Sequence, residues 1–259
     1  MSEQQSTPDR SDDDLPNVEL GSTTFEKLQR IEPPNVLYHY TDQTGLLGIL
    51  TSGELHATKV QYMNDSTEFG RAVDLAKNRM KAHVANMTEE DRQILEYVID
   101  NLDRISYINV CVVSFCKNPD LLSQWQGYSG SSGVGFSIGF FSQKLVETTH
   151  TQGCGLCGCI YDEPTQIEIV DELIDQIINF IATHRNEYHP YALQITISSA
   201  IQHKLIQFGA FFKDAAFREE QEWRLATEVK FYPAFRFRAG KSMLIPYFGL
   251  KVKNESWGN

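Results

Sequence analysis

The chain has 259 residues, a length that fits one large domain or two small ones. Hydrophobic residues make up 41% of it and charged residues 22%, which is typical of an ordinary globular protein. The net charge of −11 argues against a protein that coats nucleic acid through its overall field, because such a protein should be basic.

The composition also predicts where the protein works. No apolar run approaches the roughly 18–20 residues that span a bilayer, so no membrane association is expected. The segment 1–16 has no apolar core and does not predict a secretory signal. Five cysteines, an odd number in a chain without an export signal, indicate a reducing compartment and no disulfide framework. The expected location is the cytoplasm.

The first part of the chain predicts a tail followed by alternating short elements. Residues 1–20 are rich in Ser, Asp and Gln without an apolar period, and they predict a disordered acidic tail, with residues 21–259 forming a single domain. The expected elements are a short helix over 24–31, a strand over 36–40, a helix with Thr41 and Asp42 at its N-cap and Gly53 at its C-cap, and an extended piece over 55–62.

The remainder predicts helices and strands in alternation. The expected helices are 65–85, 88–102, 122–128 and 166–208 with a break at Pro190, and the expected strands are 108–115, 133–140, 159–161, 222–229, 231–237 and 244–252. This order predicts an α+β protein whose central sheet is mixed or antiparallel and is flanked by helices.

Two polar segments follow predicted strands early in the chain. His39 ends a strand and Thr41 begins the next helix, so side-chain and backbone groups at a sheet edge are available to a ligand; the alternative is a structural histidine. Tyr62 is followed by Asn64 and Asp65. A turn with a helix cap explains most of that polarity, but not its position directly after an aromatic strand.

Polar and aromatic residues also follow the most apolar predicted strand. Ser114 lies at its end, and Asp120, Trp125 and Tyr128 come after it. Ligand sites often form where a central strand ends in such a loop. Trp125 and Tyr128 are three apart and share a helical face, which fits either a stacking platform or a core-facing aromatic pair.

A row of charges opens a later strand. If the chain is extended, the carboxylates of Glu220 and Glu222 project from the same side and Arg224 continues the row. Two carboxylates beside an arginine can keep one carboxylate ionised and in place, and they can orient a hydroxyl group of a ligand. An edge strand with a solvated acidic face is the alternative.

The run Cys154, Cys157, Cys159 resembles part of a zinc knuckle. A structural zinc needs four ligands, and neither a second CxxC nor an HxxxH follows. A Gly-rich loop with buried thiols is therefore expected, and no metal.

Together these segments resemble a known family. The order YHYT, NDSTEF, VVSF, SQW, GFSIGF and FREEQEWR is similar to the prokaryotic family DUF2971, over residues 36–250. That family label names no activity.

A second resemblance implies one. YHYT followed by GILTSGEL is similar to the opening of ADP-ribosyltransferases, and implies that His39 and Thr41 hold the ribose and nicotinamide amide of NAD. Tyr40 stands where other branches have Gly, as in diphtheria-type toxins. Ser114 matches only the first position of the Ser-Thr-Ser segment. In the Glu-x-Glu pattern, the contact with the ribose hydroxyl falls on Glu222.

The resemblance implies an NAD-using ADP-ribosyltransferase or NAD glycohydrolase with an ADP-ribosyltransferase-like fold, acting as a toxin or antiphage effector. NAD is its substrate, no metal is expected, and the acceptor is a protein, a nucleic acid or water. An ionised Glu222 would stabilise the oxocarbenium-like ribose. Tyr62 with Trp125 or Tyr128 would clamp the nicotinamide.

Two alternatives stay open at this point. The partial Ser114 match favours a non-catalytic module that senses a nucleotide or binds a partner. A Mg²⁺-dependent nuclease or hydrolase would instead use carboxylates from several segments. Those carboxylates are Asp65, Glu68, Asp120, Glu220 and Glu222.

Overall fold

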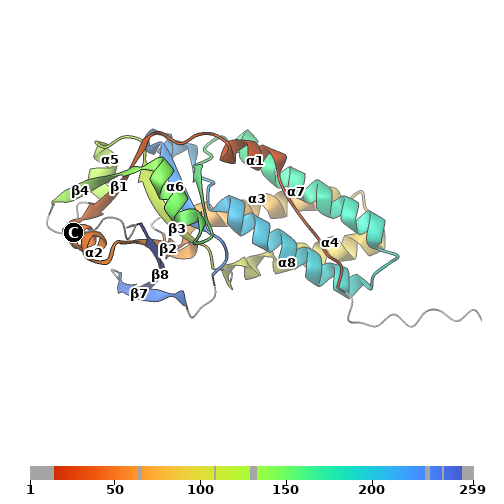
Figure 1. Cartoon of the computed structure of the whole chain (residues 1–259). Coiled ribbons are helices and arrows are strands. Elements are labelled where there is room, and N and C mark those ends of the chain that lie inside the picture. Colours follow the sequence, from red (N-terminus) through yellow and green to blue (C-terminus); the bar gives the residue numbers. More distant parts are fainter. Residues whose placement is uncertain are drawn as a thin grey trace, which may run out of the picture.

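The computed structural model describes residues 15–63, 66–107, 109–128, 133–230, 234–240 and 242–252. The predicted α+β class is confirmed. Figure 1 shows a curled sheet on one side of the molecule and a group of long helices on the other. In the described part of the chain, no helix is long and apolar enough to cross a membrane.

Within the described residues, eight strands form one sheet. The strands are β1 (Val36–Asp42), β2 (Glu54–Lys59), β3 (Cys111–Cys116), β4 (Gly135–Phe141), β5 (Cys154–Gly158), β6 (Glu222–Thr227), β7 (Arg236–Ala239) and β8 (Leu244–Lys251). Their main path runs β4-β1-β3-β2-β8-β7, and β6 pairs with both β3 and β5. Each pair of named strands is antiparallel.

The helices divide into short ones beside the sheet and long ones away from it (Figure 1). The short ones beside the sheet are α2 (Gln43–Ser52), α5 (Leu122–Tyr128) and α6 (Ser142–His150), while the short helix α1 (Thr23–Gln29) packs against the long helices. The long ones are α3 (Ser66–Val84), α4 (Glu89–Asn101), α7 (Glu163–His184) and α8 (Pro190–Gly209). Three 3-10 turns complete the chain, η1 (Val60–Tyr62), η2 (Leu102–Tyr107) and η3 (Ala215–Glu220).

The long helices form because their apolar residues recur at helical spacing. In α7, Ile169, Leu173, Ile177 and Ile181 are fully buried, and Asp162 caps the helix start. The buried residues of α7 and those of α3, α4 and α8 form one hydrophobic core that reaches Val112 on β3. A smaller core fills the other face of the sheet, under α6.

The sheet forks at β3. β6 pairs along one edge of β3, while β1 and β2 divide the opposite edge between them. β1 pairs at Cys116, whereas β2 pairs at Cys111 and Val112. Among the described residues, the middle of that edge at Ser114 therefore has no partner strand.

Helix α2 begins and ends as its sequence predicts. Asp42 is the N-cap, and its carboxylate accepts from the backbone N–H of Gly45 at 2.7 Å. Gly53 is the C-cap, in the left-handed conformation with φ of 66°. Thr41, expected as a second cap residue, belongs to β1 instead.

Gly53→Ala is expected to lower the free energy of unfolding by about 1 kcal/mol, because a Cβ is disfavoured at positive φ. Gly48→Ala is the matched control within the same helix, since a Cβ there meets nothing within 4 Å. This control should gain about 0.5–1 kcal/mol from helix propensity. Urea titration of both variants measures the difference, and equal effects would contradict this account of the cap.

Two expectations about residues 154–161 need correction. The strand predicted over 159–161 is only an isolated bridge between Ile160 and Phe212. The paired strand is β5, so the cysteine run expected as a loop begins as a strand. The predicted tail falls largely on residues 1–14, outside the described residues, whereas Leu20 is buried in the helical core.

Candidate functional site

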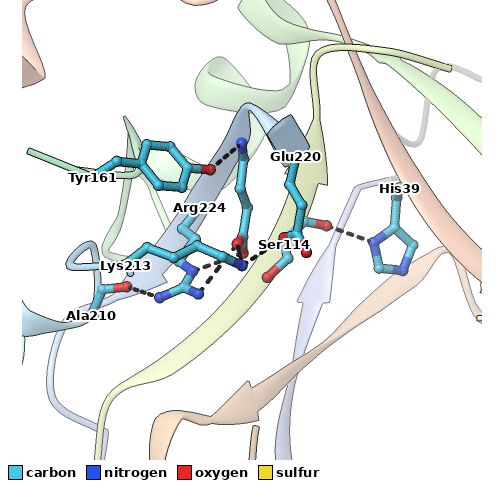
Figure 2. Close-up of polar contacts among 8 residues, drawn as sticks. His39, Ser114, Tyr161, Ala210, Lys213, Glu220 and Arg224 are labelled. Carbon is cyan, nitrogen blue, oxygen red and sulfur yellow. Dashed lines mark hydrogen bonds and ion pairs between the residues drawn. The ribbon is translucent and has the colours of Figure 1, made fainter. Parts of the chain in front are cut away.

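His39 fills the gap at the fork of the sheet. The N–H of Lys117 donates to Gln221 on the β6 edge, and backbone groups alternate between edges, so the Ser114 carbonyl points into the gap. His39 Nδ1 lies 3.0 Å from that carbonyl oxygen (Figure 2). Because a carbonyl only accepts, Nδ1 carries the proton and Nε2 carries the lone pair.

The environment of His39 keeps its ring neutral. Burial is the main effect and lowers the pKa of His39. The hydrogen bond to Ser114 opposes this shift, and the nearby charges of Arg238 and His56 lower the pKa further. At pH 7 the imidazole therefore offers an acceptor to a ligand hydroxyl or amide, and it has no spare proton to give.

Glu222 opens β6 as a buried, ion-paired carboxylate with 4% exposure. It accepts from Arg224 Nε at 2.8 Å and from Lys213 Nζ, and its backbone N–H donates to the Tyr161 hydroxyl at 2.8 Å. Arg224 also donates to the Ala210 carbonyl at 2.8 Å. In Figure 2 the side chains of Lys213 and Arg224 converge on the same carboxylate beside Ser114, and His39 lies beyond Ser114.

These partners keep Glu222 ionised. Burial by itself would raise the pKa of Glu222, but the charges of Arg224 and Lys213 outweigh it and lower the pKa to about 2. Burial likewise disfavours the Lys213 ammonium, yet Glu222 and Glu220 raise its pKa well above the usual range. At neutral pH the site holds two carboxylates and two cations, so its charge is balanced.

Glu220 reaches this cluster by a turn rather than along a strand. The sequence predicted Glu220 and Glu222 in one extended row, but Glu220 ends η3 and Gln221 has a left-handed φ of 43°. Lys213 Nζ still donates to Glu220, at 2.6 Å. The predicted row on β6 therefore consists of Glu222 and Arg224, and it lies between two strands rather than on a solvated edge.

A cleft of about 930 Å³ lies at the fork. The predicted site residues that line it are His39, Tyr40, Thr41, Tyr62, Ser114, Tyr128, Glu220, Glu222 and Arg224. His39, Ser114 and Glu222 come from three strands that are far apart in the chain, and the fold brings them to one cavity. Asn64 and Asp65, also predicted, lie outside the described residues.

Trp125 does not line the cleft. Its ring packs edge-on against Tyr40, with centroids 4.8 Å apart, and its Nε1 donates to Asp120 at 2.6 Å. The Tyr40 hydroxyl donates to the Asn118 carbonyl and accepts from the Leu121 N–H. This pair therefore holds α5 against β1, the structural alternative that the sequence left open.

Of the aromatic residues that the sequence predicted to stack on a ligand, Tyr62 and Tyr128 remain as candidates. Both line the cleft, with exposures of 39% and 36%. Loss of solvation in the cleft, and then the charge of Glu222, raise the pKa of Tyr128 to about 12, so its phenol stays protonated. An aromatic ring of a ligand can therefore contact the rings of both tyrosines.

Thr41 lies at the end of β1, close to the first turn of α2. A Cβ at Gly45 would come within 2.0 Å of Thr41 Oγ1, so the glycine is what allows this close approach. Gly45 and Gly48 both line the cleft, so the wall that α2 presents there has no side chains at these positions.

The sequence did not single out four other lining residues, Lys213, His56, Thr58 and Arg238. Lys213 lies in a short apolar-flanked segment with no motif, and its backbone is held by hydrogen bonds to Ile160 and Gln166. The excess of basic residues near the end of the chain was the one signal for Arg238.

Nothing in the described part of the chain groups three or more metal-ligating side chains. Cys154 and Cys157 are three apart on the extended strand β5, so their side chains point to opposite faces. Burial raises the pKa of Cys157 to about 12 and that of Cys154 to about 11. Glu220 and Glu222, which a Mg²⁺ site would need, already bind Lys213 and Arg224.

A family model described as "Protein of unknown function (DUF2971)" matches residues 124–225. The DUF2971 prediction is confirmed over this part of the chain. The DUF2971 match contains Tyr128, Lys213, Glu220, Glu222 and Arg224, whereas His39 and Ser114 lie before it. Neither the curated proteins nor the solved structures contain a match to this chain.

Proposed function

We propose that this protein binds NAD in the cleft at the fork and transfers its ADP-ribose to an acceptor or to water. The observation that carries this proposal is the convergence of His39, Ser114 and Glu222 on one cavity. These are positions to which the resemblance to ADP-ribosyltransferases assigns contact with NAD. An ADP-ribosyltransferase-like fold is part of the same proposal.

The reaction breaks the bond between nicotinamide and C1′ of the ribose, and nicotinamide leaves with the bonding electron pair. Positive charge develops at the ribose, and an ionised Glu222 beside it stabilises that charge and holds a ribose hydroxyl. The nucleophile of the acceptor attacks C1′ and loses its proton. The neutral His39 accepts a hydrogen bond from the ribose, and Thr41 holds the nicotinamide amide.

Two further observations fit such a ligand. The hydroxyl oxygen of Ser114 is buried and has no hydrogen-bond partner among the described residues, although it lines the cleft. Tyr62 and Tyr128 offer aromatic faces to a nicotinamide ring. The acceptor class covers proteins, nucleic acids and water, and a role as toxin or antiphage effector belongs to this same proposal.

A second candidate function is nucleotide sensing without turnover. The observation that favours it is the balanced ion cluster, in which Lys213 and Arg224 already compensate the charge of Glu222. A compensated carboxylate stabilises a cationic transition state less than an unpaired one. In this candidate the cleft still binds NAD or a related nucleotide.

The deciding experiment measures NAD binding by calorimetry and nicotinamide release by chromatography on the purified protein. Release identifies a transferase or hydrolase, and saturable binding without release identifies the sensor. Absence of both, across added proteins, RNA and DNA, would overturn both candidates.

His39→Asn tests the role of the imidazole in the same assay. Asn can still donate to the Ser114 carbonyl but is too short to replace Nε2, so NAD affinity should fall by about 3- to 10-fold. His150→Asn, at an exposed histidine ending α6, is the matched control and should bind like the native protein. Equal affinities would remove His39 from the binding site.

A further inference from the structure

The two ends of the cleft differ in how far their charged side chains are compensated by ion pairs. At one end Lys213 and Arg224 are paired with Glu220 and Glu222. At the other end the lining comes from β2 and β7, with His56, Thr58 and Arg238. In Figure 1, β7 lies at the lower edge of the sheet beyond β8, on the side away from α5.

Arg238 brings an uncompensated positive charge to that second end. Its Nη2 donates to Thr58 Oγ1 at 2.9 Å, and no carboxylate of the described residues forms an ion pair with it. Arg236, two residues earlier on the same strand, is instead paired with Glu54 and lies over the Tyr247 ring. The two arginines share a face of β7, but Arg238 alone of the pair lines the cleft.

His56 and Thr58 complete a set of donors around this charge. The His56 ring stacks on Tyr247 with centroids 4.0 Å apart, which fixes its orientation at the cleft wall. Thr58 is 8% exposed, and its hydroxyl proton remains available because its oxygen is the acceptor for Arg238. A guanidinium, an imidazole and a hydroxyl together suit a phosphate group, which accepts several hydrogen bonds at once.

We propose that Arg238, His56 and Thr58 form an anion subsite that binds the pyrophosphate of a dinucleotide whose ribosyl end lies at Glu222. The orientation rests on the proposed function, whereas the anion subsite does not. The dianionic pyrophosphate in the middle of such a ligand matches the end of the cleft where Arg238 has no carboxylate partner among the described residues, whereas the Glu222 end is already charge-balanced by Lys213 and Arg224. Ser114, whose hydroxyl has no hydrogen-bond partner in the described part of the chain, lines the same cleft.

The test compares Arg238→Gln with Arg236→Gln, with calorimetric binding of inorganic pyrophosphate, ADP-ribose and nicotinamide riboside. Arg238→Gln should weaken pyrophosphate and ADP-ribose by about 10- to 100-fold, because it removes charge-assisted hydrogen bonds. It should leave nicotinamide riboside, which has no phosphate, unchanged. Arg236→Gln should stay within about 2-fold of the native protein for all three probes. Arg238→Lys should fall between, since it keeps the charge but loses the planar fork.

The outcomes separate this inference from the proposed function. Binding of pyrophosphate and ADP-ribose that depends on Arg238, in a protein that neither binds nor consumes NAD, supports the subsite and overturns the function. NAD consumption whose KM is unchanged in Arg238→Gln overturns the subsite and leaves the function standing. Equal losses in the two arginine variants, or no binding of pyrophosphate by the native protein, also overturn the subsite. Circular dichroism of the three arginine variants should match that of the native protein, because both positions are exposed.

Discussion

Glu222→Gln should lower the rate of nicotinamide release from NAD by about 10²- to 10³-fold, the size of the loss when one electrostatic contact to a transition state is removed. Gln keeps the size of the side chain and can still accept from Arg224, but it carries no charge to stabilise the ribosyl cation. Single-turnover kinetics at saturating NAD measures the chemical step, and the affinity for NAD should change far less.

The same substitution also disturbs the ion cluster, so the activity loss needs a control for stability. Removing the Glu222 charge takes away one of the carboxylates that bind the buried Lys213 ammonium, and the melting temperature should fall. The double variant Lys213→Met/Glu222→Gln removes one charge of each sign and should recover stability without recovering activity. If activity returns with stability, Glu222 is structural and the transferase proposal fails.

Lys213→Met should lower the free energy of unfolding by about 3 kcal/mol, because it leaves buried Glu222 and Glu220 short of a cation. For a chain of this length that corresponds to a fall in melting temperature of about 6–12 °C. Lys144→Met is the matched control, since it breaks an ion pair with Glu147 on the exposed surface of α6. Its melting temperature should not move measurably.

The fall in the free energy of unfolding at acid pH tests the same ion pair. The pKa of Glu222 is about 2 in the folded protein against an ordinary value of 4.5, so its contribution is present above pH 4.5 and is lost as the pH falls toward 2. The full contribution is about 3 kcal/mol. Lys213→Met should flatten this part of the pH profile, and Lys144→Met should reproduce the native slope. Identical acid limbs in all three proteins would contradict the assigned role of Lys213.

Local chemistry explains why much of the secondary structure could be predicted. The apolar period of α7, the aspartate cap and glycine end of α2 and the continuous apolar run of β3 each act within a few residues. The same reasoning placed Glu222 and Arg224 on one face of a strand, because alternation along a strand is local. It failed at Gln221, since a left-handed non-glycine residue leaves no mark in the pattern.

The candidate site was predicted only in part, for reasons of distance along the chain. His39, Ser114 and Glu222 came from motifs, but Trp125 was expected in the cleft and instead packs on Tyr40. The contact between Lys213 and Glu222 depends on a turn and on hydrogen bonds to Ile160 and Gln166. Such contacts carry no sequence signature, because each partner is ordinary in its own segment.

Composition, periodicity and caps are short-range properties, and they predicted an α+β chain with a charged strand start at Glu222; they also predicted a strand end at His39, which instead lies in the middle of β1. The fork at β3 arises from pairings between residues that are far apart in sequence, with Tyr38 opposite Cys116 and Thr58 opposite Val112. Register between distant strands is set by the packing of the whole sheet, so the cleft, the ion pairs of Glu222 and the contact of Arg238 with Thr58 follow from tertiary contacts alone.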